Sequence, residues 1–189
     1  MAVTREHIEQ WTPDHLEQAM AYINAQHPRW TDHYSSMESQ LSKLGWKGFG
    51  ADMAIEEAYR DNITALAAAT PVQAATITLS TAAGDLTAGQ QAILGLIDVA
   101  EKEPPPLGGF RVTINDGVTV DDVAYQSGYP NAAIEQARKA QALGHAMDIT
   151  SAINSWQALK SAMAAHIQAH AAALRMVQFS NGRPVSGGA

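Results

Sequence analysis

The feature that most constrains the fold is a long row of side chains spaced alternately four and three residues apart. The row follows Thr12-Pro13, a good N-cap residue and the residue favoured at the first helical position. Such a row lies along one side of an α-helix and predicts a long helix that packs lengthwise against another. Pro28 interrupts the row without shifting it, so we expect a kink there and not a break. Eight of the nine positions are apolar or aromatic: Leu16, Met20, Ile23, His27, Trp30, Tyr34, Met37, Leu41 and Leu44.

The stretch LGWKGFG, residues 44–50, should end this helix. Glycine destabilises a helix interior by about 0.5–1 kcal/mol relative to alanine, and glycines stand at positions 45, 48 and 50. A second helical stretch begins near Phe49 or Gly50, so LGWKGFG is interpreted as the apex of a helical hairpin. Whether Trp46 packs inward as a clamp on the helix ends or is presented outward stays open. The apolar side of the second stretch includes Ile55, Tyr59, Ile63 and Leu66.

The second helical stretch continues to about residue 103, with a kink or break expected near Pro71. Its later part carries one apolar row, although a β-strand over QAATITLS is the alternative. EKEPPPLGG cannot be helical, and two β-prone runs around Asn115-Asp116-Gly117 predict a small β-hairpin near 110–120. A last helix, 131–176, follows Tyr129-Pro130. The apolar row of the later part is Leu79, Ala82, Leu86, Ile93, Ile97 and Ala100, and that of the last helix is Ile149, Ile153, Trp156, Lys160, Met163, Ile167, His170 and Leu174.

These patterns predict a mainly α fold. We expect an elongated antiparallel bundle of long helices around 13–44, 49–103 and 131–176, with one helix-turn-helix hairpin and one small β-hairpin. Residues 1–178 form one helical domain in this interpretation. The small and polar residues 179–189 form a flexible tail or linker.

Composition excludes several classes of function. The formal net charge is −7, which argues against a nucleic-acid partner because phosphate binding needs a basic face. The chain has no cysteine, so disulfides and thiolate chemistry are excluded. The start, MAVTREHIEQW, has no apolar segment of a secretory signal. No run of 18 apolar residues predicts a transmembrane helix, so we see no strong membrane signal.

No catalytic motif is found, and the chain is not expected to be an enzyme. His166 and His170 have the i, i+4 spacing of zinc proteases, but Ile167 occupies the place of their general base. Asp116, Asp121 and Asp122 lack the spacing of a calcium-binding loop. We therefore name no catalytic residue, metal ligand or cofactor. Acid–base catalysis by convergent histidines and carboxylates, as in a hydrolase, is kept as an alternative.

Trp46-Lys47-Gly48 is a W-x-G tripeptide in the turn between two amphipathic helices. At these residues the chain resembles the WXG (ESAT-like) superfamily of type VII secretion substrates of actinobacteria, in which the motif joins the two helices of a hairpin. A second stretch, AGQQAILGLIDVAEKE followed by GFRVTINDGVTVDD, looks like the amino-terminal domains of larger mycobacterial substrates, which precede variable effector domains. The PPPLGG segment between its two halves departs from that pattern.

The resemblance implies a secretion signal, Tyr-x-x-x-Asp/Glu, on the helix after the turn or in a partner. The match in this chain, Tyr34 to Glu38, lies before the turn. We therefore name Trp46 and Gly48 as the interaction motif, and Tyr34 and Glu38 as a weak candidate for the signal.

The resemblance also implies what the chain does. It would be a virulence-associated mycobacterial type VII substrate, or its targeting domain, acting through helix–helix recognition. Its partner would be the secretion ATPase or a chaperone, with a helical partner protein or a second copy as further possibilities. It would be cytoplasmic before export, then secreted or in the cell envelope by a leaderless route. A pore-forming or structural helical protein is the remaining alternative.

Overall fold

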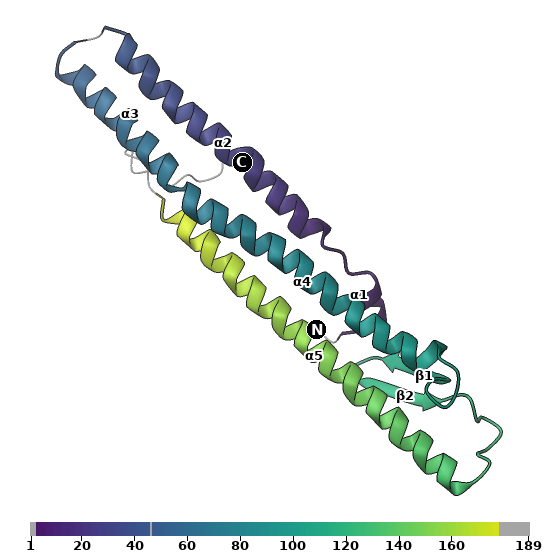
Figure 1. Cartoon of the computed structure of the whole chain (residues 1–189). Helices are drawn as coiled ribbons and strands as arrows, with labels where there is room; N and C mark the ends of the chain where they lie inside the picture. The colour runs from purple at the N-terminus through teal and green to yellow at the C-terminus, as the bar shows by residue number, and fades with distance from the viewer. Residues whose placement is uncertain (1–2, 46, 178–189) are drawn as a thin grey trace. The chain divides into compact units, whose positions relative to one another are not determined.

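The computed structural model describes residues 3–45 and 47–177. The fold is mainly α with one small β-hairpin, as the sequence predicted. Along the chain these residues form α1 (Arg5–Glu9), α2 (Asp14–Lys43), α3 (Phe49–Ala67), α4 (Ala69–Lys102), β1 (Phe110–Ile114), β2 (Val118–Asp122) and α5 (Ala132–Arg175), as Figure 1 shows.

The predicted helices are present, with bounds close to those expected. α2 is helical throughout, Pro28 included. The break expected near Pro71 lies at Ala68, between α3 and α4. A proline ring clashes with the carbonyl group four residues earlier, which here belongs to Ala67, the last residue of α3. Pro71 itself lies in the first turn of α4, where a missing N–H removes no helical hydrogen bond.

Two expectations change. QAATITLS is part of α4, so the alternative β-strand assignment is wrong. The sequence did not predict α1, a helix of 5 residues that is too short to show a periodic pattern. Its N-cap is Thr4, whose hydroxyl oxygen accepts a hydrogen bond from the N–H of His7 at 3.2 Å.

The chain divides into two compact units. The single helical domain over 1–178 stays a prediction. Unit 1 contains residues 3–13 and 84–161 of the described chain, and unit 2 contains residues 14–83 and 162–177. α4 and α5 contribute residues to both units. The tail predicted over 179–189 lies outside the described residues.

Unit 1 is built around the β-hairpin. β1 and β2 pair antiparallel, from Phe110 opposite Asp122 to Ile114 opposite Val118. Asp116 in the predicted turn has a φ of 56°, a conformation that Asp tolerates better than most residues. The inward side chains of β1 are buried, and the core also contains four fully buried isoleucines: Ile8, Ile93, Ile97 and Ile149.

A buried ion pair attaches the hairpin to α5. The Arg138 guanidinium contacts the Asp122 carboxylate through two nitrogens, each at 2.8 Å, and both side chains are almost fully buried. Arg138 also donates to the carbonyl groups of Pro106 and Gly108, at 2.7 and 2.9 Å. Its guanidinium lies over the Phe110 ring, 3.8 Å from the centroid. One arginine thus joins the 104–109 loop, β1, β2 and α5.

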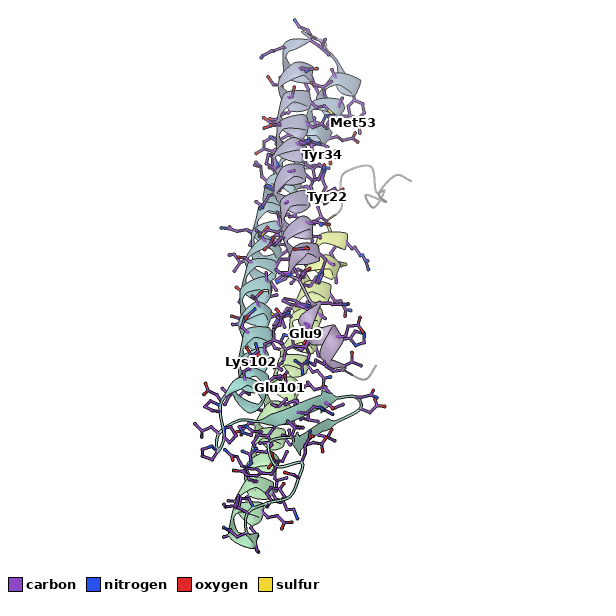
Figure 2. The ribbon with its side chains drawn as sticks, turned by 90° about the vertical axis from the view of Figure 1, so that its right-hand side faces the viewer. Glu9, Tyr22, Tyr34, Met53, Glu101 and Lys102 are labelled. Atoms are coloured by element: carbon purple, nitrogen blue, oxygen red, sulfur yellow. The ribbon has the colours of Figure 1, made fainter. Side chains whose placement is uncertain are left out.

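A second polar contact attaches the hairpin to α1 and α4. Arg5 in α1 pairs with Glu101 near the end of α4 at 2.7 Å, and Glu101 accepts the N–H of Val112 in β1 at 3.1 Å. Figure 2 shows Glu101 at the end of α4, beside the hairpin. A polar residue also supports α1, since buried Gln90 donates to the carbonyl of Ile8 at 2.6 Å.

Candidate interaction surface

The sequence motif that carries the resemblance lies in the turn of the α2–α3 hairpin in unit 2. Gly45 and Gly48 have φ angles of 62° and 108°, in the region that glycine adopts without strain. Gly48 is the N-cap of α3, and its carbonyl accepts the N–H groups of Ala51 and Asp52 at 2.9 and 3.1 Å. The predicted hairpin apex is therefore present, with Gly48 as a required turn residue. Trp46 lies outside the described residues.

α2 lies antiparallel to α3 and to the beginning of α4. α2 packs against α3 (Figure 1). The Asn62 amide nitrogen donates to Glu38 at 2.6 Å, and further from the turn the Thr76 hydroxyl donates to the Asn24 side-chain oxygen at 3.3 Å. The number of residues from Glu38 back to Asn24 equals the number from Asn62 on to Thr76, as a regular helical hairpin requires. The predicted row of α2 is its more covered side: Leu16 is buried, Trp30 and Leu44 are exposed, and the other six residues are half-buried.

The apolar side that the sequence predicted for α3 is not its buried side. Ile55 is half-buried, but Tyr59, Ile63 and Leu66 are exposed, at 53%, 47% and 55% of their full accessible area. The residues of α3 that are buried are three alanines and one acid: Ala51, Ala58, Ala65 and Asp61. Small side chains allow a neighbouring helix to approach closely, so the alanine side takes the packing position and leaves the larger residues outside.

The apex of the hairpin presents large apolar side chains. Leu44, the residue after α2, is 67% exposed, and Phe49 at the start of α3 is 81% exposed. Met53 is also exposed, one turn along α3, and Figure 2 labels it. Lys43 and Lys47 flank these residues and are exposed. Contiguous apolar side chains on a protein surface mark sites of interaction more often than scattered ones do.

The candidate signal residues contact α3. Tyr34 is half-buried and stacks edge-on against His33, with ring centroids 5.3 Å apart. Burial, together with the nearby charge of Asp61, raises the pKa of the Tyr34 hydroxyl. Glu38 accepts the hydrogen bond from Asn62. Tyr34 and Glu38 thus lie on the side of α2 that packs within the hairpin, which fits a role in hairpin assembly.

Asp61 and Asn62 are the site residues that the sequence prediction missed. They place a carboxylate and an amide on the side of α3 that packs within the hairpin. A single polar residue in such a contact sets the register between two helices. The sequence did indicate the position of Asp61, because Asp61 follows Ala58 by three residues and so lies on the same side of the helix as the alanines. The larger apolar residues of α3 indicated the other side as the buried one.

The histidines do not gather into a metal site. Among the described residues no group of three or more His, Asp or Glu side chains could hold a metal ion. Of the predicted pair, His166 is exposed, whereas His170 contacts the Thr78 hydroxyl at 3.0 Å. His145 contacts the carbonyl oxygen of Leu107 at 3.1 Å.

One helical stretch is apolar enough to cross a membrane by length and composition. It lies within Phe49–Lys102, where an 18-residue window has a mean hydropathy of 1.3. This segment was not predicted from the sequence, because the chain has no uninterrupted run of 18 apolar residues. The core helix of a water-soluble protein gives the same signal, and 28% of this window is buried.

Comparison with protein-family models, with curated proteins and with solved structures finds no match to this chain. The resemblance to WXG proteins therefore rests on the residues named above.

Proposed function

We propose that the α2–α3 hairpin is a recognition module that directs this chain to a type VII secretion machinery. The observation that carries the proposal is the apex, where a W-x-G sequence joins two antiparallel helices. Large apolar side chains are exposed on both sides of it, as in Leu44 and Phe49. Residues that serve folding alone would gain free energy by burial, at roughly 25 cal/mol per Å² of apolar surface. Their exposure favours a receptor that covers them.

The mechanism needs no catalysis. A secretion ATPase or chaperone with an apolar pocket would take up Phe49 and Leu44, and the positive-φ glycines would let the chain reverse between these two residues without strain. Tyr34 and Glu38 would act indirectly, by keeping the two helices in register.

Export of the full chain in an actinobacterial host tests the proposal. Secretion should require an intact type VII locus, and Trp46→Ala and Phe49→Ser should each reduce the exported fraction severalfold without changing the thermal unfolding temperature. Unchanged export after deletion of the locus would refute the proposal.

Two glycines provide a matched pair. Gly48→Ala strains a φ of 108°, whereas Gly50 lies in the first turn of α3, where an added Cβ meets nothing within 4 Å. We expect export to fall for Gly48→Ala and to persist for Gly50→Ala. Equal export of the two variants would show that the shape of the turn is not recognised.

A second candidate is a membrane-active helical protein. The hydrophobic window within Phe49–Lys102 favours it, together with the exposed apolar apex. Release of a dye from liposomes by the purified chain would distinguish it from a targeting domain, which should cause no leakage.

A further inference from the structure

The two edges of the β-hairpin differ in how their backbone groups are used. The Asn115 N–H donates to the Gly117 carbonyl at 3.0 Å, so these two residues form a hydrogen-bonded pair. From this pair outward, non-hydrogen-bonded and hydrogen-bonded residue pairs alternate along the two strands. Val112 and Val120 are opposite each other, and in this alternation they form a pair whose N–H and C=O groups point away from the partner strand. In β1 both outward groups of Val112 are used: Glu101 accepts its N–H, and Arg5 donates to its carbonyl at 3.4 Å.

The outward groups of β2 have no such partners. By the same alternation, the N–H and C=O groups of Val118 and Val120 point away from β1. No hydrogen bond from the described residues reaches these four groups. Thr4 pairs with Asn115 and so extends the β1 side of the turn, not the β2 side. Within the described part of the chain β2 is therefore an unpaired strand edge, which is a template for a further strand.

A cleft of about 330 Å³ adjoins the turn end of this edge. Its apolar lining includes Ile114 and Val118 from the hairpin and Ile153 from α5. Its polar lining residues include Asn154 and Gln157 on α5 and Asp116 in the turn. No lysine or arginine lines it within residues 3–45 and 47–177. This lining fits a long basic side chain, whose aliphatic stem prefers apolar walls and whose head prefers a carboxylate and amide oxygens.

We propose that β2 and this cleft bind an extended peptide that carries an arginine. The peptide adds a third strand along Val118–Asp122, where it bonds to the outward groups of Val118 and Val120. Its arginine enters the cleft and pairs with Asp116. Backbone bonds supply the affinity and the side-chain pocket supplies the specificity, as in other peptide-binding modules that add a strand. The site lies in unit 1 and does not depend on the proposed function of the α2–α3 hairpin.

Fluorescence anisotropy on the full chain tests the site with a labelled hexapeptide, Thr-Val-Arg-Val-Thr-Val, and the same peptide with glutamate in place of arginine. The arginine peptide should bind saturably and the glutamate peptide much more weakly. Val120→Pro removes an outward N–H without removing a bond of the β1–β2 ladder, so affinity should fall by about tenfold or more. Val120→Thr keeps the N–H and serves as its control. Asp116→Asn should reduce the preference for arginine.

A second measurement leaves the protein unchanged. Two versions of the peptide, N-methylated at odd or at even residues, block opposite edges of the added strand. One version should lose binding and the other should keep it. The proposal is overturned if the arginine peptide does not bind, if Val120→Pro and Val120→Thr bind it equally, or if the two methylated peptides behave alike. Self-association of the chain that Val120→Pro abolishes would also overturn it, because the occupant would then be a second copy.

Discussion

At the residue scale, the position of Trp156 depends on the absence of a side chain on α4. The indole N–H of Trp156 donates to the carbonyl of Leu86 at 2.9 Å, and its ring meets Trp11 edge-on, with centroids 5.9 Å apart. The ring lies over Gly89, where an added Cβ would stand 2.7 Å from Trp156 Cδ1. Gly89 is thus required for packing, although its position in the middle of a helix makes it unfavourable locally.

Substitution of Gly89 by alanine should therefore destabilise unit 1. The added methyl group has to displace a buried indole, and overpacking of this kind costs about 1–3 kcal/mol. Gly95 is the matched control in α4, since a Cβ there meets nothing within 4 Å. Gly95→Ala should be neutral or stabilising by up to about 1 kcal/mol, because alanine favours helix. Urea unfolding followed by circular dichroism compares the two variants, and an equal loss of stability would contradict the packing argument.

Arg138 should be one of the most sensitive charged residues of unit 1. Arg138→Met leaves the Asp122 carboxylate buried without its cation and the carbonyls of Pro106 and Gly108 without this donor. Removing one partner of a buried pair costs about 3–5 kcal/mol. Lys139→Met provides the control, because Lys139 pairs with Glu135 on the exposed side of α5 and such pairs contribute less than about 1 kcal/mol. A loss for Arg138→Met as small as that of the control would show that the pair does not hold the hairpin.

At the element scale, α3 and α4 share one line of buried residues spaced by seven. The spacing passes through the break at Ala68 unchanged, which keeps one side of both helices available for packing. Within α3 the residues of this line are alanines, and within α4 they are mostly larger. The line contains Ala51, Ala58, Ala65, Val72, Leu79, Leu86, Ile93 and Ala100, all buried.

This line predicts that in α3 substitution of a small alanine lowers stability more than substitution of a large apolar residue does. Ala58→Leu places a large side chain where α2 packs closely and should destabilise the chain by about 1–3 kcal/mol. Ile63→Gln changes a larger apolar residue that is 47% exposed, and should change stability by less than about 0.5 kcal/mol. Thermal unfolding of the two variants checks this order. A greater loss for Ile63→Gln would mean that the apolar side of α3 is covered in solution.

The positions of most helices could be predicted from the sequence, but the side on which α3 packs could not. Large apolar residues at regular spacing located α2, the later part of α4 and α5, because burial of such residues dominates the packing of long helices. In α3 the rule gave the wrong side for packing, since close helix approach favoured alanine. The β-hairpin followed from local turn chemistry around Asn115-Asp116-Gly117. α1 did not follow, because its five residues depend on a contact with Gln90, far along the chain.

At the scale of the whole molecule, the division into two units could not be predicted from local patterns. α4 and α5 each run through both units, so no linker marks the boundaries that lie within these two helices. The polar anchors of unit 1, such as Arg138 with Asp122, depend on residues that meet only after folding. The turn at the apex of unit 2 could be predicted from the sequence, but the exposure of Phe49 is seen only in the structure.

Low pH should destabilise unit 1 in particular, because two carboxyl groups with a lowered pKa belong to this unit. The Arg138 hydrogen bond lowers the pKa of Asp122 against the opposing effect of burial. For Glu101 burial acts to raise the pKa, but the bonds from Arg5 and from the Val112 N–H outweigh it and the pKa falls. A lowered pKa gives stability that is present at neutral pH and is lost as the pH falls through the lowered value.

Hydrogen exchange read residue by residue should therefore show that β1 and β2 lose protection below about pH 4, as these carboxylates are protonated. Asp122→Asn cannot titrate, so its hairpin should be less protected than the wild type at pH 7 and should lose less on acidification. The α2–α3 amides report the opening of unit 2. If they lose protection together with the hairpin at every pH, the acid response belongs to the whole chain, and the two carboxylates do not set it.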